Sequence, residues 1–241
     1  MPGDKIHILS TGNIPAFTNP SSEIILDIFS FQEIKFRETP GLRQQVFELA
    51  QKPCFVIFTS SNAVKSVAAL LDNRKDSRVR VNTQSPRWNC FCVGDKTKEA
   101  LLKSLPDCTV LATADLAGEL SKKIIAVNPS PLIFFSGNLR REELPLQLTG
   151  SDINFEELVV YETIYSAIPL KQHYHGILFF SPGAVNAYFE ANKPDPGTVL
   201  FAIGPTTESA LHKQTKNKVL TTERPDKAAL ANMALQYFEA Y

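Results

Sequence analysis

Short apolar runs alternate with segments of helical spacing along most of the chain. The run "CFVIFTS" at 54–60 is followed by "NAVKSVAALL" at 62–71, in which apolar residues recur every three to four positions. The run "GILFFS" at 176–181 is followed in the same way by "GAVNAYFEA" at 183–191. Each pattern predicts a strand, a tight turn and a helix.

A second strand-turn-helix pattern follows each of these segments. It occurs as "NCFCVGDKTKEALL" at 89–102 and as "VLFAIGPTTESAL" at 199–211. Related segments then begin at Asp115 ("DLAGEL") and at Asp226 ("DKAAL"). The repetition indicates two related α/β lobes.

The middle of the chain offers enough elements for one complete lobe. Short buried strands that alternate with helices are typical of parallel sheets covered on both faces, because parallel strands need crossover connections. We therefore expect α/β lobes of flavodoxin-like or Rossmann-like type. The predicted elements are strands at 54–59, 89–93, 108–111, 132–136 and 153–157 and helices at 43–50, 62–72, 96–103, 116–126 and 140–148.

The C-terminal part of the chain has too few strands for a covered sheet of its own. Three are predicted, at 176–181, 198–203 and 217–220. The N-terminal segment can supply others, because it predicts a strand at 5–10, a helix at 20–30 and a strand at 31–36, yet it is too short to fold alone.

These observations predict a discontinuous arrangement. Residues 1–36 and 168–241 are expected to form the first lobe, and residues 43–157 the second. The segments 37–42 and 158–167 are then the crossings, and the second is apolar and alternating, as in a strand. We expect a two-stranded β linker, with the active site in the cleft between the lobes.

Composition excludes several classes of partner. The chain has 241 residues, 44% of them hydrophobic, and its 25 basic residues balance 25 acidic ones. No global field therefore recruits nucleic acid or an anionic membrane, and the partner is recognised by a site. The N-terminal apolar run is too short for a signal peptide and no stretch approaches a membrane span, so we expect a cytoplasmic protein. The four cysteines lack CxxC spacing and predict buried reduced thiols, without a disulfide framework or a zinc site.

Common catalytic motifs are missing from the sequence. It contains no GxGxxG, GxxxxGK[ST], HExxH or GxSxG pattern. His173 and His175 could share one side of a strand and bind a metal, but no further ligand cluster is visible, and a solvated strand entrance is the alternative. The run 73–87 carries five basic residues and one acidic residue; it predicts an exposed loop, with contact to an anionic ligand as the alternative.

Small hydroxyl or glycine turns recur between the predicted strands and helices. In parallel sheets such turns lie at the carboxyl ends of the strands, where these folds bind ligands, and helix N-termini offer N–H groups to anions. Each hydroxyl could instead serve only as a helix cap, but together the turns favour binding. The turn residues are Thr59, Ser60, Ser61, Gly94, Ser136, Gly137, Asn138, Ser181, Pro182, Gly183, Gly204, Thr206 and Thr207.

Five segments carry a family resemblance in their order and spacing. They are Thr59–Val64, "VGDKTKEAL" at 93–101, the run from Gly137 through Arg141 to Tyr161-Glu162-Thr163, "FFSPGAV" at 179–185 and "AIGPTTESAL" at 202–211. With these, the chain resembles the uroporphyrinogen-III synthase family over most of its length, most strongly from 54 to 230.

The resemblance implies a cyclising hydro-lyase of tetrapyrrole biosynthesis. Members of this family close the linear tetrapyrrole hydroxymethylbilane to uroporphyrinogen III, with inversion of the last ring and loss of water through a spiro intermediate. No cofactor, metal or enzyme nucleophile is needed. Two α/β lobes joined by a β-ladder are implied, as are a monomer and a transient hand-over of substrate from hydroxymethylbilane synthase.

The resemblance also assigns roles to residues. Tyr161 matches a tyrosine of the inter-lobe strand and would donate a proton to the leaving hydroxyl, since an ordinary phenol stays protonated at neutral pH; packing in the linker is the alternative. Thr206 and Thr207 would hold acetate or propionate groups with their turn, and Ser60, Ser61, Ser181 and Gly183 would do the same.

One departure from the family pattern concerns the first strand, which often ends in Thr-Arg and here ends in Thr11-Gly12. A basic contact to a substrate carboxylate is then missing or supplied elsewhere, for example by Arg141, whose alternative is an exposed salt bridge.

Two other functions fit the same pattern. A two-lobed protein could bind a small molecule by hinge motion without chemistry, because fold does not fix function. A degenerate synthase could keep tetrapyrrole binding as a sensor. A measurement of turnover distinguishes both of these functions from an enzyme.

Overall fold

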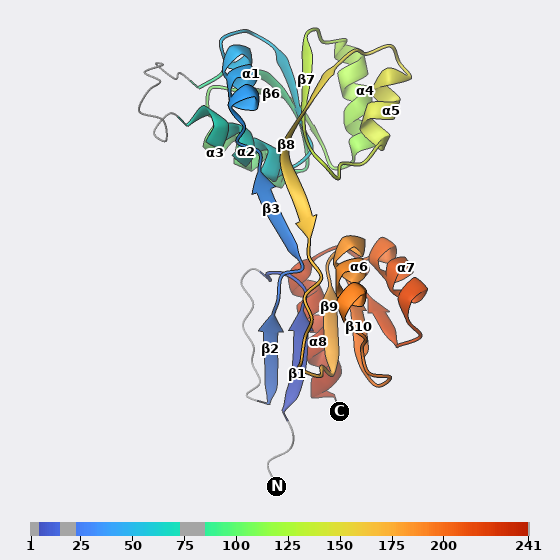
Figure 1. Cartoon of the computed structure of the whole chain (residues 1–241). Helices are drawn as coiled ribbons and strands as arrows, with labels where there is room; N and C mark the ends of the chain where they lie inside the picture. The colour runs from blue at the N-terminus through green and yellow to red at the C-terminus, as the bar shows by residue number, and fades with distance from the viewer. Residues whose placement is uncertain (1–4, 15–22, 73–84, 241) are drawn as a thin grey trace. The chain divides into compact units, whose positions relative to one another are not determined.

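The protein is described by a computed structural model that covers residues 5–14, 23–72 and 85–240 (Figure 1). The chain divides into two compact units, the first formed by Met1–Glu33 with Ile164–Tyr241 and the second by Ile34–Thr163. The two crossings fall within strands β3 (Gln32–Phe36) and β8 (Glu156–Tyr165). The α/β fold class with parallel sheets is confirmed.

The sheet of unit 1 is entirely parallel in its paired strands. Its order is β11-β10-β9-β1-β2, so β1 from the N-terminal segment lies between β9 and β2. The strands are β1 (Ile6–Ser10), β2 (Ile24–Ile28), β9 (Gly176–Phe179), β10 (Val199–Ala202) and β11 (Val219–Thr221), and the helices are α6 (Pro182–Ala191), α7 (Pro205–Gln214) and α8 (Lys227–Glu239).

Both faces of this sheet are covered. Leu9, Ile177 and Leu200 pack in one cluster with α6 and α7. Their chain neighbours point to the opposite face, because side chains alternate along a strand, and there they pack with α8. Burial on both faces explains why strands β9 and β10 are apolar at every position.

The sheet of unit 2 has the order β3-β8-β7-β4-β5-β6. All the pairs from β8 to β6 are parallel, whereas β3 and β8 run in opposite directions (Figure 1). The further strands are β4 (Phe55–Phe58), β5 (Asn89–Val93), β6 (Thr109–Ala114) and β7 (Leu132–Gly137), and the helices are α1 (Pro40–Ala50), α2 (Ser61–Leu71), α3 (Asp95–Ser104), α4 (Ala117–Val127) and α5 (Glu143–Thr149).

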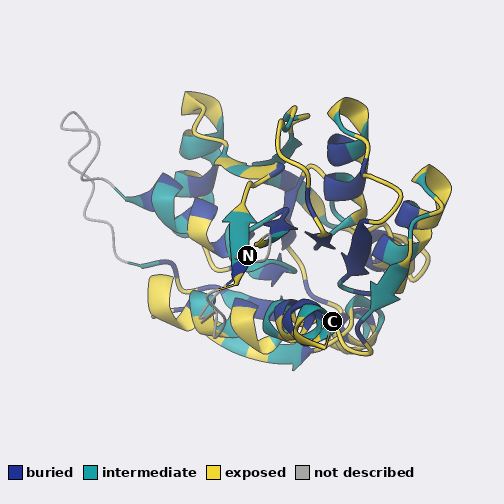
Figure 2. Cartoon of the chain, turned by 90° about the horizontal axis from the view of Figure 1, so that it is seen from below, coloured by how far each residue is buried: buried dark blue, intermediate teal, exposed yellow. Residues whose placement is uncertain are grey.

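Helices α1, α2 and α3 cover one face of the second sheet, and α4 and α5 cover the other. The central strands are largely buried, while the helices expose their outer residues (Figure 2). All four cysteines are buried and unpaired, as predicted. Burial raises the pKa of the Cys54 and Cys92 thiols to about 12, which keeps them protonated and inert at neutral pH.

Four predicted elements differ from the structure. The helix expected at 20–30 is wrong, because Ile24–Ile28 is strand β2: three β-branched residues pair in parallel with β1. The linker strand expected at 37–42 is also wrong, because α1 begins at Pro40, with Thr39 as its cap accepting from the Leu42 N–H at 3.3 Å. The strands expected at 153–157 and 158–167 are one strand, β8.

Other expectations concern single residues. His173 Nδ1 lies 2.8 Å from Asp195 Oδ2, and His175 Nδ1 accepts a hydrogen bond from the His7 N–H. Within the described ranges no group of three or more potential metal ligands occurs. The basic loop expected at 73–87 falls mostly outside the described residues. In the part of the chain that the structure describes, no helix has the length and apolar character needed to cross a membrane.

Candidate functional site

A hollow of about 340 Å³ opens in unit 2 beside the carboxyl ends of its strands. Four residues predicted from the sequence line it: Thr59, Ser60, Arg141 and Tyr161. These residues lie at one edge of the sheet because the strands are parallel, and the strand-to-helix turns of parallel strands meet on the same side of a sheet. The topology therefore makes this hollow a candidate ligand site.

The first turn of the hollow is also a helix cap. Ser60 caps α2, and its hydroxyl accepts a hydrogen bond from the Asn62 N–H at 3.1 Å. Ser61 is the first residue of α2 and does not line the hollow. For Ser60 the capping role is thus observed, and Thr59 is the hydroxyl of this turn that remains as a ligand donor.

Gly94 has a conformational reason to be glycine. Its φ of 75° lies in the left-handed region that residues with a Cβ avoid, and it starts helix α3 without a side-chain cap. Its N–H donates to Ala114 O at 2.9 Å. Gly94 belongs to the edge but does not line the hollow.

The turn after β7 is largely engaged in internal hydrogen bonds. Ser136 is 1% exposed and donates to Glu157 Oε1 at 2.6 Å. The Asn138 side chain accepts from the Thr163 N–H at 2.8 Å and donates to Thr163 O at 3.3 Å. Neither side chain is free to bind a ligand in this arrangement.

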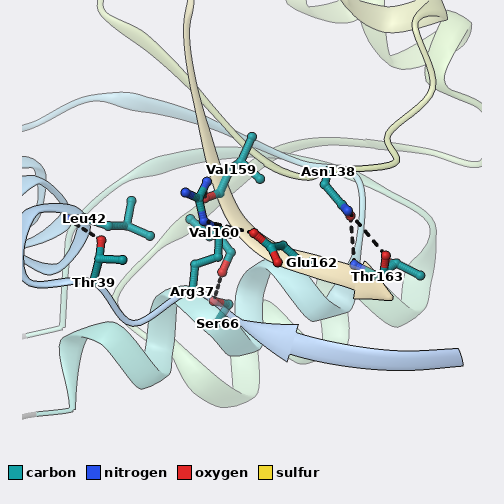
Figure 3. Close-up of polar contacts among 9 residues, drawn as sticks. All are labelled: Arg37, Thr39, Leu42, Ser66, Asn138, Val159, Val160, Glu162 and Thr163. Atoms are coloured by element: carbon teal, nitrogen blue, oxygen red, sulfur yellow. Dashed lines mark hydrogen bonds and ion pairs between the residues drawn. The ribbon is translucent and has the colours of Figure 1, made fainter. Parts of the chain in front are cut away.

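Strand β8, which carries Tyr161, is held by side chains on several sides (Figure 3). Ser66 donates to Val160 O at 2.5 Å, and Arg37 donates to Val159 O at 3.3 Å. Asn138 holds the backbone at Thr163. Tyr161 lies between these anchored positions, so its backbone has little freedom.

Gly137 allows the Tyr161 ring to lie over the end of β7. The two residues are register partners, and a methyl group added at Gly137 would lie 2.4 Å from the Tyr161 ring carbon Cζ. Only a glycine permits this approach.

Arg140 is bound by carboxylates, whereas its neighbour Arg141 is not. Arg140 Nε and Nη2 lie 2.6 and 2.9 Å from the two oxygens of Glu157, and Nη1 lies 2.7 Å from Glu142 Oε1. These hydrogen bonds hold the pKa of the Glu157 carboxyl below its usual range, against burial, which raises it. Arg141 is exposed and has no hydrogen bond or ion pair among the described residues.

The edge of unit 1 carries the other predicted turns. Ser181 caps α6, accepting from the Ala184 N–H at 3.1 Å, and its Oγ lies 3.2 Å from the Tyr165 hydroxyl. The Tyr165 ring covers Gly183, where an added methyl group would lie 2.2 Å from ring carbon Cζ. Pro182 is exposed at the first position of α6.

Two neighbouring threonines at the start of α7 differ in their exposure. Gly204 precedes the helix in an extended conformation. Thr207 is 1% exposed and its N–H donates to Gly204 O at 3.0 Å, whereas Thr206 is exposed. Thr206 is therefore the hydroxyl of this turn that a ligand can reach in unit 1.

The sequence did not single out several residues of these edges. Arg140, Leu116 and Leu139 line the hollow of unit 2, and Tyr165 completes the turn of unit 1. A signal existed for Arg140, which is adjacent to Arg141, but nothing in the spacing says which arginine pairs internally.

Comparison with known proteins shows to which family the chain belongs. A model of the family described as uroporphyrinogen-III synthase HemD matches residues 24–232 of this chain. The chain belongs to the uroporphyrinogen-III synthase family. The uroporphyrinogen-III synthase of Saccharomyces cerevisiae is 26% identical in an alignment 141 residues long, which covers 51% of this chain and 51% of the yeast protein. The match thus spans about half the length of that relative.

Solved structures of uroporphyrinogen-III synthases share the fold. One from Helicobacter pylori matches with a TM-score of 0.67 and 19% identity, covering 96% of this chain and 99% of that one. A mutant from Thermus thermophilus matches with a TM-score of 0.61 and 17% identity, covering 98% and 100%. The expectation of a cleft between two lobes stays a prediction.

The close approach of Tyr161 to Gly137 predicts a coupled effect on stability. Gly137→Ala should lower the free energy of unfolding by about 1–2 kcal/mol, because the methyl group forces the ring away. In a Tyr161→Ala background the same change should cost almost nothing. Urea unfolding of the four proteins measures the coupling, and equal costs in both backgrounds would contradict it. Gly41→Ala, where nothing lies within 4 Å of the added carbon, is the control.

The Glu157–Arg140 pair predicts a pH-dependent contribution to stability. Glu157→Gln should lower the free energy of unfolding by about 2 kcal/mol at pH 7, because it removes the charge that accepts from Nε and Nη2 of Arg140 and leaves only Glu142 as an ionic partner. The folded-state pKa of Glu157 is lowered, so the stabilisation is complete above the unfolded-state pKa of about 4.3 and is lost as the pH falls through the folded pKa.

Unfolding of wild type and Glu157→Gln from pH 7 to 3 tests this sign. The difference between them should shrink below about pH 4. Glu156→Gln, on the same strand and exposed, is the matched control and should change stability by about 0.5 kcal/mol or less. If the difference in free energy of unfolding between wild type and Glu157→Gln increased as the pH falls, the stabilising role of ionised Glu157 would be refuted.

Proposed function

We propose that this protein is an active uroporphyrinogen-III synthase, which closes hydroxymethylbilane to uroporphyrinogen III with inversion of the last ring and loss of water. The observation that carries the proposal is the family match over residues 24–232, which includes both donor-rich edges. Chemical support comes from the hollow of unit 2, where Tyr161 and Thr59 occur together with Arg141, which has no ion pair among the described residues.

The proposed reaction begins with departure of the terminal hydroxyl. A proton joins this hydroxyl as its C–O bond breaks, so that water leaves and a stabilised azafulvene cation remains. The already substituted carbon of the far ring then attacks this carbon, forming a new C–C bond and a spiro intermediate. The bond from the spiro carbon to its original bridging carbon then breaks, and that bridging carbon bonds to the free α-carbon of the same ring. Loss of the proton on that α-carbon restores the pyrrole, so that the ring is inverted and the macrocycle is closed. These steps need no redox cofactor, because no electrons leave the substrate.

Tyr161 is the residue proposed to assist the departing hydroxyl. It lines the hollow, and its ring rests over Gly137 at the carboxyl edge of the sheet. Its phenol O–H can donate to the leaving oxygen, as a general acid does. Positioning supplies the larger part of the rate effect, since the substrate is flexible and can close at the wrong carbon.

The carboxylates of the substrate are assigned to the accessible donors of the two edges. In unit 2 these are Arg141 and Thr59. In unit 1 they are Thr206 and the first turn of α6 after Ser181. Backbone N–H groups at helix N-termini favour such anions. A monomeric state, a hand-over from hydroxymethylbilane synthase and a cytoplasmic location stay predictions.

The decisive measurement is an isomer assay with freshly generated hydroxymethylbilane. The bilane closes spontaneously without inversion, so an excess of type III porphyrin over the protein-free blank, after oxidation and chromatography, reports catalysis. Only type I product from folded protein would refute the enzyme, and retained porphyrin binding in that case would indicate a binding or sensor protein.

Tyr161→Phe is expected to lower kcat at least about tenfold while leaving the unfolding midpoint nearly unchanged, because only one proton donor is removed. The matched control is Tyr237→Phe on α8, which should retain full turnover. Both are measured in the isomer assay. Unchanged turnover of Tyr161→Phe would remove this phenol from the mechanism.

A further inference from the structure

Two large apolar side chains are exposed at the hollow of unit 2. Leu116 is 61% exposed and Leu139 is 60% exposed, and both line the hollow. They come from different elements, since Leu116 is the N-cap of α4 and Leu139 follows β7. Single exposed leucines are common on protein surfaces. Two that border one hollow provide an apolar contact surface for a ligand.

The lining of the hollow mixes polar and apolar residues, and part of its wall is hydrocarbon. Phe134 and Leu144, each 1% exposed, line it from β7 and α5. A ligand that enters would therefore contact hydrocarbon both inside and at the rim. Such a surface binds a flat apolar body, and it offers little to a compact anion such as phosphate.

The charged residues that line the hollow differ in whether they are free to bind a ligand. Arg140 is held by Glu157 and Glu142, which leaves Arg141 as the exposed guanidinium. Asp115 and Glu143 also line the hollow. A ligand carboxylate is attracted by Arg141 and repelled by these two acids, so its place is at Arg141. The acids are acceptors that suit an N–H donor.

These three chemistries occur together in a pyrrole that carries acid side chains, since it has an apolar ring face, a ring N–H and carboxylates. We propose that the hollow is a subsite for one pyrrole ring of the substrate, with Leu116 and Leu139 against the ring, Arg141 on a ring carboxylate, and Asp115 or Glu143 accepting from the ring N–H. This assignment rests on the proposed function and adds the two leucines as residues that bind substrate.

The leucines can be tested without risk to the fold, because both are mostly exposed. Leu116→Ser and Leu139→Ser should each raise the KM for hydroxymethylbilane about fivefold, through lost apolar contact, and leave kcat within about twofold. Leu146→Ser is the matched control: Leu146 is 67% exposed on α5 but does not line the hollow. It should leave KM unchanged. Leu139→Ser and Leu146→Ser should keep the wild-type unfolding midpoint, and Leu116→Ser should keep or raise it, because a serine at the N-cap of α4 can cap the helix.

Arg141→Gln tests the carboxylate contact in the same assay, with an expected rise in KM of about tenfold. The wild-type rise of KM with salt should be weaker in this variant, because one charge contact is gone. A neutral apolar contact would not change the salt dependence, so the readout separates the two parts of the subsite.

A second readout is independent of turnover. Titration with uroporphyrin, followed by absorbance, should give a Kd that rises about fivefold in Leu116→Ser and in Leu139→Ser and stays constant in Leu146→Ser. Absence of type III product from the wild type would refute the proposed function, while this titration would still test the subsite. Type III activity with wild-type KM and Kd in both leucine variants would refute the subsite alone.

Discussion

The backbone of strand β8 is the constraint on which the candidate site of unit 2 depends. Sheet pairing fixes one edge of the strand against β7, and hydrogen bonds from Ser66, Arg37 and Asn138 fix further positions on it. A tyrosine on a strand held in this way has a defined direction. Gly137 then leaves room for its ring, so that the phenol is placed by backbone geometry before any substrate arrives.

The need to hold the backbone of the edge in place also explains why many polar residues of the turns have structural roles. Turns at the carboxyl edge of a parallel sheet leave helix N–H groups without partners, and Ser60 and Ser181 satisfy some of them. Ser136 and Asn138 hold β8. Fewer hydroxyls than the sequence suggests are thus open to a ligand. A stable edge and a binding edge compete for the same residue types.

Much of the fold could be predicted from the sequence, since buried parallel strands are continuous apolar runs and amphipathic helices follow them. Strand β5 lies at the predicted 89–93. Strand β2 could not be predicted in this way: only Ile24 of Ile24–Ile28 is buried, and its pairing with β1 depends on tertiary structure. The hydroxyl turns lie at the carboxyl ends of the strands, as expected, and their role in ligand binding stays a prediction. Spacing does not show which of Thr206 and Thr207 is exposed, because this depends on burial in the fold. Nor does it show which of Arg140 and Arg141 is paired with a carboxylate.

Arg140 and Arg141 also show how charge can be divided between structure and recognition. Two adjacent guanidinium groups repel each other at the mouth of one hollow. Glu157 and Glu142 neutralise Arg140, which keeps the loop after β7 attached to the sheet. The exposed positive charge left in the lining of the hollow is then Arg141, beside exposed leucines and the acids Asp115 and Glu143. A ligand with a carboxylate next to an apolar ring meets both groups at once, whereas a small anion meets only the cation. In the proposed subsite, selectivity would therefore follow from the internal pairing of one arginine.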